Sequence, residues 1–283
     1  GDMASAYWPG YALLLAPFQW FGIPWACNPL MVAATTLLIG RIAHELTGSE
    51  EAQGWAMLLA IASPTFLING ISFYSMPAHL LFNLVFAWLL IRPEPKRIVF
   101  AGAVGSFALV LHNPFPHLLF ALPWLTWLVL RKENGVRNAL LLVIGYLPLM
   151  LLIGLGWPHV LRELQQGGVV AAAAASATSS GEELPWVVRI VIGLTRPFHL
   201  PDAMTLTFRL GGLAKLWLWS APFLLLLAIR GATLEDRPPL RLMGASLALT
   251  LLGYFFVPVS QGHGWGDRYA HSAWGVLPIL AAV

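Results

Sequence analysis

The chain has 283 residues, of which 58% are apolar and 10% charged, and its mean hydropathy is +0.72. A soluble domain carries about a quarter charged residues, so this composition excludes a soluble globular protein and indicates a membrane protein. The net charge of +3 is too small to indicate a nucleic-acid partner, and the single cysteine, Cys27, excludes an internal disulfide or a thiolate metal site.

Continuous apolar runs follow one another along the chain. A bilayer core of about 30 Å needs roughly 17 to 25 helical residues, and continuous rather than alternating hydrophobicity favours helices over strands. The predicted spans are Ala26–Ala43, Trp55–Ser72, Ala78–Ile91, Ile98–Leu111, Pro116–Leu130, Asn138–Gly156, Leu213–Ile229 and Leu242–Val257, with another beginning at Ser272. Tyr11–Phe21 is too short to cross comfortably and is expected to be interfacial or re-entrant. We therefore predict an all-α, polytopic membrane bundle forming one transmembrane domain over residues 1–283, with about eight to ten membrane helices.

The connections between these runs form two sets that differ in charge. The short connections within 41–51, 92–97, 131–137 and 230–241 hold ten of the 16 basic residues. The other set comprises the N-terminal stretch, 73–77, 112–116, a long loop over 157–212, and 258–271. Because basic loops stay in the cytoplasm, we expect the second set to face the periplasm or the exterior of a bacterial inner or plasma membrane.

The long outer loop over 157–212 divides into three parts. We expect a surface helix over Trp157–Gln166, a low-complexity stretch over Val169–Gly181, and an amphipathic interfacial segment over Leu184–Arg209. A solvated lid is the alternative for the last part.

Polar chemistry is concentrated in the outer set of loops. Seven of the eight histidines lie there or at its edge, whereas almost no ionisable residue lies deep inside a predicted span. Ion-coupled transporters place such residues near the membrane midplane, so this distribution disfavours a transporter.

Three outer segments combine a turn with aromatic or imidazole side chains. Trp8–Tyr11 contains a Pro-Gly turn and two aromatic residues at interfacial depth. Tyr74–His79 places an imidazole near a helix N-terminus, where it either helps to bind phosphate or simply caps the helix. His112–His117 contains two prolines and two histidines, which resemble a metal pair only weakly because no carboxylate lies nearby in sequence.

The fourth outer segment, Gln261–His271, is the most informative stretch. Its alternating glycines allow the backbone to approach a ligand closely, while Trp265 and Tyr269 offer stacking faces and Arg268 offers a guanidinium for phosphate. The alternative is a surface pair of Asp267 and Arg268 on a glycine-rich turn.

Taken together, these residues resemble those of the polyprenyl-phosphate-sugar glycosyltransferases of the GT-C superfamily. This group includes protein O-mannosyltransferases, aminoarabinose transferases and lipopolysaccharide-core transferases. The matching segments, in chain order, are Trp8-Pro9-Gly10-Tyr11, Asn28-Pro29, Ala62-Ser63-Pro64, the break around Asn113-Pro114, and Gly266-Asp267-Arg268-Tyr269.

The resemblance implies a lipid-linked sugar at the outer membrane interface. The donor phosphate would be bound by Arg268, assisted by His263 and His79, and the substrate loops would contribute Tyr11, Tyr74, His112, Asn113, His117, Trp265, Asp267 and Tyr269. The expected partners are the bilayer, a polyprenyl-phosphate-linked sugar, and a glycan, lipid or protein acceptor, with no nucleic acid. We expect no cofactor and no metal site.

The resemblance also implies a catalytic carboxylate on a first outer loop that follows a first spanning helix. Only seven residues precede Trp8, and Asp2 is the one acid among them. We therefore expect the first helix, the first outer loop and the catalytic base to lie upstream of residue 1, and this piece alone to be inactive.

Two other functions remain open at this point. An O-antigen ligase or polymerase also works on an undecaprenyl donor at the outer face, but it carries its key groups on a large late loop without the early Pro-Gly turn. A non-enzymatic transporter or lipid scramblase would show internal repeats and polar residues in the membrane interior, and neither is clear in this sequence.

Overall fold

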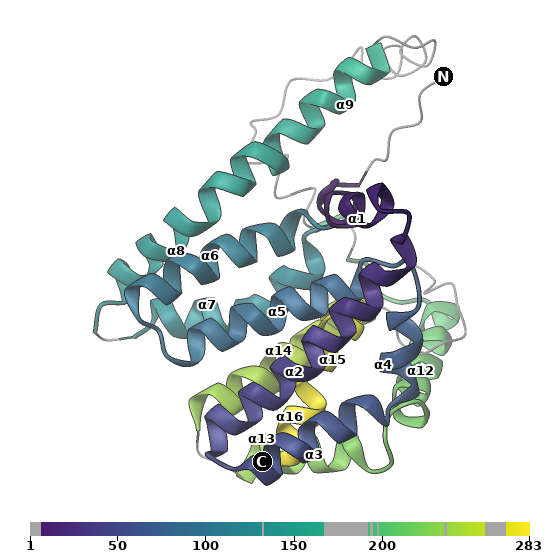
Figure 1. Cartoon of the computed structure of the whole chain (residues 1–283), viewed down its shortest axis with the longest axis vertical. Coiled ribbons are helices and arrows are strands. Elements are labelled where there is room, and N and C mark those ends of the chain that lie inside the picture. Colours follow the sequence, from purple (N-terminus) through teal and green to yellow (C-terminus); the bar gives the residue numbers. More distant parts are fainter. Residues whose placement is uncertain are drawn as a thin grey trace.

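The computed structural model describes residues 7–131, 133–166, 192, 195–196, 198–234, 237–257 and 270–283. All regular secondary structure within these ranges is helical, which confirms the predicted all-α class (Figure 1). The helices with their bounds are α1 (Gly10–Trp20), α2 (Cys27–Thr47), α3 (Glu50–Ile61), α4 (Pro64–Gly70), α5 (Met76–Ile91), α6 (Pro95–Val110), α7 (Phe115–Val129), α8 (Gly135–Leu149), α9 (Gly156–Gln166), α12 (Ala203–Leu218), α13 (Leu224–Leu234), α14 (Pro238–Phe255), α15 (His271–Trp274) and α16 (Val276–Ala282). A 3₁₀ turn, η1 (Pro24–Ala26), precedes α2, and a π-helical segment, η2 (Met150–Leu155), joins α8 to α9.

Proline determines where several helices begin. Pro64, Pro77, Pro95 and Pro238 each occupy one of the first two positions of a helix, where the missing N–H leaves no hydrogen bond unmade. α1 spans 11 residues, in agreement with the expectation that this run is too short to cross a membrane.

Two predicted spans are wrong because each is interrupted. The run Trp55–Ser72 contains α3 and α4 as separate helices, since Pro64 cannot continue the hydrogen bonding of α3. The run Leu213–Ile229 is divided between α12 and α13 by a turn that ends at Phe223, whose φ is 62°. α12 begins at Ala203, so the last residues of the expected 157–212 loop are helical.

The two interruptions contact each other. The N–H of Thr65 donates to the carbonyl of Trp219 over 3.0 Å, and the N–H of Ala221 donates to the hydroxyl of Ser63 over 2.8 Å. The backbone groups released at one break are therefore satisfied by the other break, which explains how both are tolerated inside a bundle.

α8, η2 and α9 form one long rod, and its α9 end extends away from the body of the molecule (Figure 1). The predicted helix over Trp157–Gln166 exists, but it continues the rod instead of lying along the surface. Pro148 removes one backbone donor near the end of α8, and the π-helical turns follow directly. The low-complexity stretch Val169–Gly181 lies outside the described residues.

The surface of the bundle is apolar over wide areas. On α8, Val136, Leu140 and Ile144 recur at helical spacing and are each more than half exposed. Soluble monomers rarely expose continuous apolar surface, so these faces suit a lipid environment. Among the residues that the structure describes, two stretches are long and apolar enough to cross a membrane, Pro24–Thr47 with 24 residues and Gly135–Leu161 with 27.

Contacts between connections define two ends of the bundle. At the basic end, comprising the described residues of 41–51, 92–97, 131–137 and 230–241, Glu45 pairs with Arg92 and Arg97, and Arg237 donates to the carbonyl of Leu46. At the histidine end, comprising residues 7–11, 72–79, 111–117, 198–199 and 270–272, loops distant in sequence bond to one another. These contacts join three of the four basic connections to one another and, separately, join the described parts of the histidine-bearing connections.

Candidate functional site

The N-terminal turn packs against the connection between α6 and α7. The N–H of Trp8 donates to the carbonyl of His112 over 3.2 Å, and the N–H of Tyr11 donates to that of Leu111 over 2.9 Å. The rings of Tyr7 and His112 stack with their centroids 3.9 Å apart. Two of the predicted substrate segments, Trp8–Tyr11 and His112–His117, thus form a single surface.

The glycine of this turn is required by close approach to a neighbouring helix. A Cβ placed on Gly10 would lie 2.5 Å from the carbonyl oxygen of Val110 at the end of α6. Any larger residue would push α1 away from α6, so the Pro9-Gly10 pair fixes the position of Tyr11.

Asn28 connects the turn to the third predicted segment. The hydroxyl of Tyr11 donates to Oδ1 of Asn28 over 3.2 Å, while Nδ2 of Asn28 donates to the carbonyls of Ser72 and Tyr74 over 2.6 and 2.8 Å. Burial raises the pKa of the Tyr11 phenol to about 12, so it remains a neutral donor at physiological pH. The Asn28-Pro29 motif therefore holds two tyrosine-bearing loops together.

A buried polar network lies beneath these loops, with Asn83 of α5 at its centre. Nδ2 of Asn83 donates to the carbonyls of Pro116 and Ser272 over 3.2 and 3.0 Å. Both amide hydrogens are thus used, so Oδ1 must accept the 2.7 Å bond from Nδ1 of His117. Nε2 of His117 is then the acceptor in its 2.6 Å bond with the hydroxyl of Tyr146. These bonds fix His117 as a neutral imidazole of one tautomer.

The network joins helices that are far apart in sequence. Asn83 lies on α5, His117 on α7 and Tyr146 on α8, and Ser106 of α6 donates to the carbonyl of Tyr146 over 2.6 Å. Asn83 and His117 are completely enclosed. Because Ser272 belongs to α15, the network also anchors the chain that directly follows residues 258–269.

Two further histidines near the network are enclosed. His79 of α5 and His271 of α15 are buried, and within the described parts of the chain no ring nitrogen of either one hydrogen-bonds to a protein group. His271 stacks with Phe66 and Trp274 at centroid distances of 6.2 and 6.4 Å. Among the described residues, each imidazole therefore keeps one donor and one acceptor unused. His79 does not cap its helix, because its side chain is enclosed and the backbone N–H of His79 pairs with the carbonyl of Ser75.

The structure brings six of the predicted site residues to the histidine end, namely Tyr11, Tyr74, His79, His112, Asn113 and His117. Asn113 has a local role, since its Oδ1 accepts the N–H of Phe115 over 3.2 Å at the start of α7. The other predicted residues, His263, Trp265, Asp267, Arg268 and Tyr269, lie outside the described residues.

Sequence reasoning missed Asn83, Tyr146 and Ser106 as members of this region, whereas His271 falls at the end of the predicted segment Gln261–His271. It searched the spans for ionisable groups and passed over uncharged polar side chains. A lone asparagine within the apolar sequence LLFNLVF is itself a signal, because a polar group in a membrane helix needs a partner and often marks a functional region.

The chain before α12 lies against the same end. The N–H of His199 donates to the carbonyl of Phe256 over 2.8 Å, and the rings of Phe198 and Phe115 meet edge to face. Arg209 is 5% exposed and donates to the carbonyl of Val257, whereas Met204, Leu206 and Phe208 on the same helix are exposed. Asp202 caps α12, and the backbone N–H of Thr205 lowers the pKa of its carboxyl.

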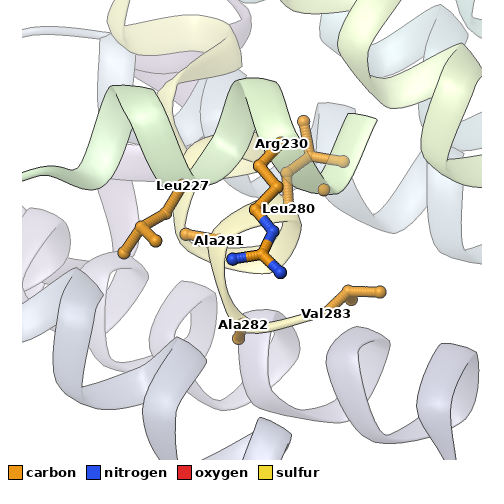
Figure 2. A pocket seen from close by; sticks show the side chains of 7 residues that line it. Leu227, Arg230, Leu280, Ala281, Ala282 and Val283 are labelled. Carbon is orange, nitrogen blue, oxygen red and sulfur yellow. The ribbon is translucent and has the colours of Figure 1, made fainter. Parts of the chain in front are cut away.

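Other features of the described residues lie away from the histidine end. Among these residues, no three histidine, cysteine, aspartate or glutamate side chains gather as metal ligands. A cavity of about 270 Å³ lies where α13 meets α16, and Figure 2 shows Arg230 extending into it beside Leu280 and Val283. Because Arg230 belongs to the basic end, this cavity is separate from the candidate site.

Comparisons with known proteins identify a fold. No protein-family model and no curated protein sequence matches the chain. Among solved structures, the chain resembles ArnT from Cupriavidus metallidurans bound to undecaprenyl phosphate, with a TM-score of 0.62 and 15% identity over 98% of this chain and 49% of that one. The apo structure of the same protein gives a TM-score of 0.54 and 14% identity over 98% and 48%. The chain thus spans about half the length of the structures it matches, and over that length it has the helical fold of ArnT.

Proposed function

We propose that this chain is the whole or part of a membrane glycosyltransferase that moves a sugar from a polyprenyl-phosphate donor to an acceptor hydroxyl at the histidine end. One observation carries the proposal: three of the motifs that resemble the GT-C superfamily, Trp8–Tyr11, Asn28-Pro29 and the break around Asn113-Pro114, meet at one end of an ArnT-like bundle. Tyr11, Asn28 and Tyr74 are joined by hydrogen bonds, and His112 accepts a bond from the same N-terminal turn. The undecaprenyl phosphate bound by ArnT supports the choice of donor.

The proposed chemistry matches the neutral character of this end. The acceptor oxygen attacks the anomeric carbon, the bond from that carbon to the phosphate oxygen breaks, and a base takes the acceptor proton. The leaving group is an anionic lipid phosphate, so donors placed around it stabilise charge that grows in the transition state. The lipid phosphate is itself the leaving group, so the proposed reaction uses no cofactor.

Arg268, assisted by His263 and His79, is the proposed phosphate-binding group. Its place in the chain supports this role, since His271 and Ser272 follow it closely and Ser272 is bonded to Asn83. A guanidinium offers a planar pair of donors that suits phosphate oxygens.

The proposed orientation places the basic end in the cytoplasm and the histidine end at the periplasmic or outer face. Phe73 is exposed at the histidine end and Glu94 at the basic end, so single cysteines at these positions can report the orientation. A membrane-impermeant thiol reagent applied outside intact cells is expected to label Phe73→Cys and not Glu94→Cys. The reverse pattern would contradict the proposed orientation. The native Cys27 is buried, so it is not expected to react with the reagent.

Sugar transfer tests the function itself. Membranes containing the full-length protein are supplied with radiolabelled polyprenyl-phosphate sugars, and incorporation into acceptor is measured. Arg268→Ala is expected to lower the transfer rate about 100-fold, the usual effect of removing one donor to a developing anion. Arg41→Ala, which removes an exposed cation at the basic end, serves as the matched control and is expected to leave the rate unchanged. An unchanged rate in Arg268→Ala would refute the phosphate-binding role.

A further inference from the structure

The crossing of α6 and α8 is unusually close. A Cβ on Gly102 would collide with the carbonyl oxygen of Leu142 and lie 2.8 Å from the Cα of Gly145, and a Cβ on Gly145 would collide with the carbonyl oxygen of Val99. The two helices therefore touch backbone to backbone at this point, as small residues allow in membrane proteins.

A groove of about 420 Å³ opens beside this crossing toward the basic end. Its lining is formed by Pro95, Lys96, Val99, Phe100, Ala103 and Leu141. Positions 96, 99, 100 and 103 lie on one face of α6 by their helical spacing, and Leu141 of α8 forms the opposite wall. All of these side chains except Lys96 are apolar, and Phe100 is 65% exposed.

Lys96 is the cation of the groove. The neighbouring Arg97 is already engaged, since it pairs with Glu45, donates to the carbonyl of Trp88 and lies over the Trp88 ring. Within the described ranges Lys96 makes no ion pair, and its side chain is exposed at the groove mouth. Arg137 lies one helical turn before Leu141, so α8 places a second exposed cation at the same end.

We propose that this groove binds one anionic glycerophospholipid. An acyl chain lies along Val99, Phe100, Ala103 and Leu141, and the phosphate headgroup meets the ammonium of Lys96. The apolar wall of the groove matches an acyl chain. At its end, Lys96, which makes no ion pair within the described ranges, matches an anionic headgroup. This inference concerns the lipid environment and is independent of the proposed sugar transfer.

The experiment measures lipid retention by the purified full-length protein. The protein is exchanged into detergent containing equal amounts of phosphatidylglycerol and phosphatidylcholine with identical acyl chains, and retained lipids are counted by native mass spectrometry. We expect one phosphatidylglycerol to be retained in preference to phosphatidylcholine. Lys96→Ala is expected to lower that preference about fivefold, the contribution of one cation near an anionic headgroup, and Lys96→Glu is expected to abolish it.

Two further variants separate this groove from general attraction to basic protein. Arg41→Ala removes another exposed cation of the basic end away from the groove and is expected to leave the preference unchanged. Ala103→Phe fills the groove wall and is expected to lower retention of both lipids. Lys96→Ala and Lys96→Glu alter an exposed side chain and leave the packing intact, so the test stands even if Ala103→Phe does not fold.

Several results would overturn the proposal. Equal retention of the two lipids would show that the groove does not bind the headgroup. An equal loss of the phosphatidylglycerol preference in Arg41→Ala and Lys96→Ala would show that net charge alone attracts the lipid. Failure to retain any lipid would show that another part of the protein, or nothing specific, occupies the groove.

Discussion

The two ends of the bundle satisfy their polar groups in different ways. At the basic end, Glu45 is 8% exposed and forms ion pairs of 3.0 Å with Arg92 and 3.8 Å with Arg97, and it accepts a 2.8 Å bond from the indole of Trp88. At the histidine end, the described residues around Asn83 use only neutral amide, imidazole, hydroxyl and carbonyl groups.

This difference indicates separate roles. The ion pairs of Glu45 with Arg92 and Arg97 and its bond from Trp88 tie α2, α5 and α6 together, so they contribute to folding. The described residues of the Asn83 network contain no carboxylate that would repel an anion, so this end suits a phosphate-bearing lipid. Substitutions at the basic end should therefore lower stability, and substitutions at the histidine end should also lower sugar transfer.

The largest effect is expected from Asn83→Leu. Leucine is similar in size but removes both donors to the carbonyls of Pro116 and Ser272 and the acceptor for His117, so three buried polar groups each lose a hydrogen bond. At roughly 1 to 3 kcal/mol for each group, the free energy of unfolding should fall by several kcal/mol, and sugar transfer should be lost.

Ser246→Ala is the control for Asn83→Leu. It removes one buried hydrogen bond, from the hydroxyl of Ser246 to the carbonyl of Phe120, without touching the candidate loops. Unfolding in detergent and sugar transfer are measured for both variants. Equal losses of activity in the two would show that Asn83 acts as an ordinary packing residue.

Glu45→Ala should have the next largest effect on stability. It leaves the guanidinium of Arg97 and the indole N–H of Trp88 without their carboxylate, which should cost about 3 kcal/mol, the lower end of the range for breaking a buried pair because Arg92 is well exposed. Glu45→Gln keeps an acceptor for Trp88 and should cost less. Sugar transfer should remain normal in both variants when it is divided by the amount of folded protein, which size-exclusion chromatography measures. A loss of transfer beyond the loss of folded protein would contradict the assignment of the basic end to folding.

Two glycine substitutions provide the finest comparison. A Cβ on Gly105 would lie 2.8 Å from Nε2 of His117, whereas a Cβ on Gly54 of α3 meets no atom within 4 Å. Gly105→Ala should therefore destabilise by about 1 to 3 kcal/mol through overpacking. Gly54→Ala should stabilise by about 0.5 to 1 kcal/mol through helix propensity. Chemical unfolding measures the free energy of unfolding of both variants. If Gly105→Ala were stabilising, as Gly54→Ala is expected to be, the histidine network would not be tightly packed.

The sequence predicted the features that depend on local pattern. Continuous apolar runs predicted helices, and the position of basic residues separated the two ends before any contact was known. Pro64 and Pro222 indicate breaks in the helices. Two predicted spans nevertheless included these prolines, because a short turn inside an apolar run does not change its mean hydropathy much. Each break is stabilised by the other across the bundle, and no local pattern encodes that pairing.

The candidate site was only partly predictable for the same reason. Tyr11, Tyr74 and His112 belong to turns with recognisable Pro or Gly residues, so the sequence indicated them. Asn83 and Ser272 are 189 positions apart, and their bond follows from how α5 and α15 pack. Uncharged polar residues within spans are therefore the class that reasoning from periodicity and charge overlooked.

The most direct test of the central claim is to map where a polyprenyl phosphate binds. A photoreactive polyprenyl phosphate is crosslinked to the full-length protein in membranes, with and without excess undecaprenyl phosphate, and the labelled peptides are identified by mass spectrometry. We predict competed labelling within 72–79 and 111–117, and no competition by the uncharged polyprenol. Competed labelling confined to 92–97 or 131–137, or equal competition by polyprenol, would contradict the account.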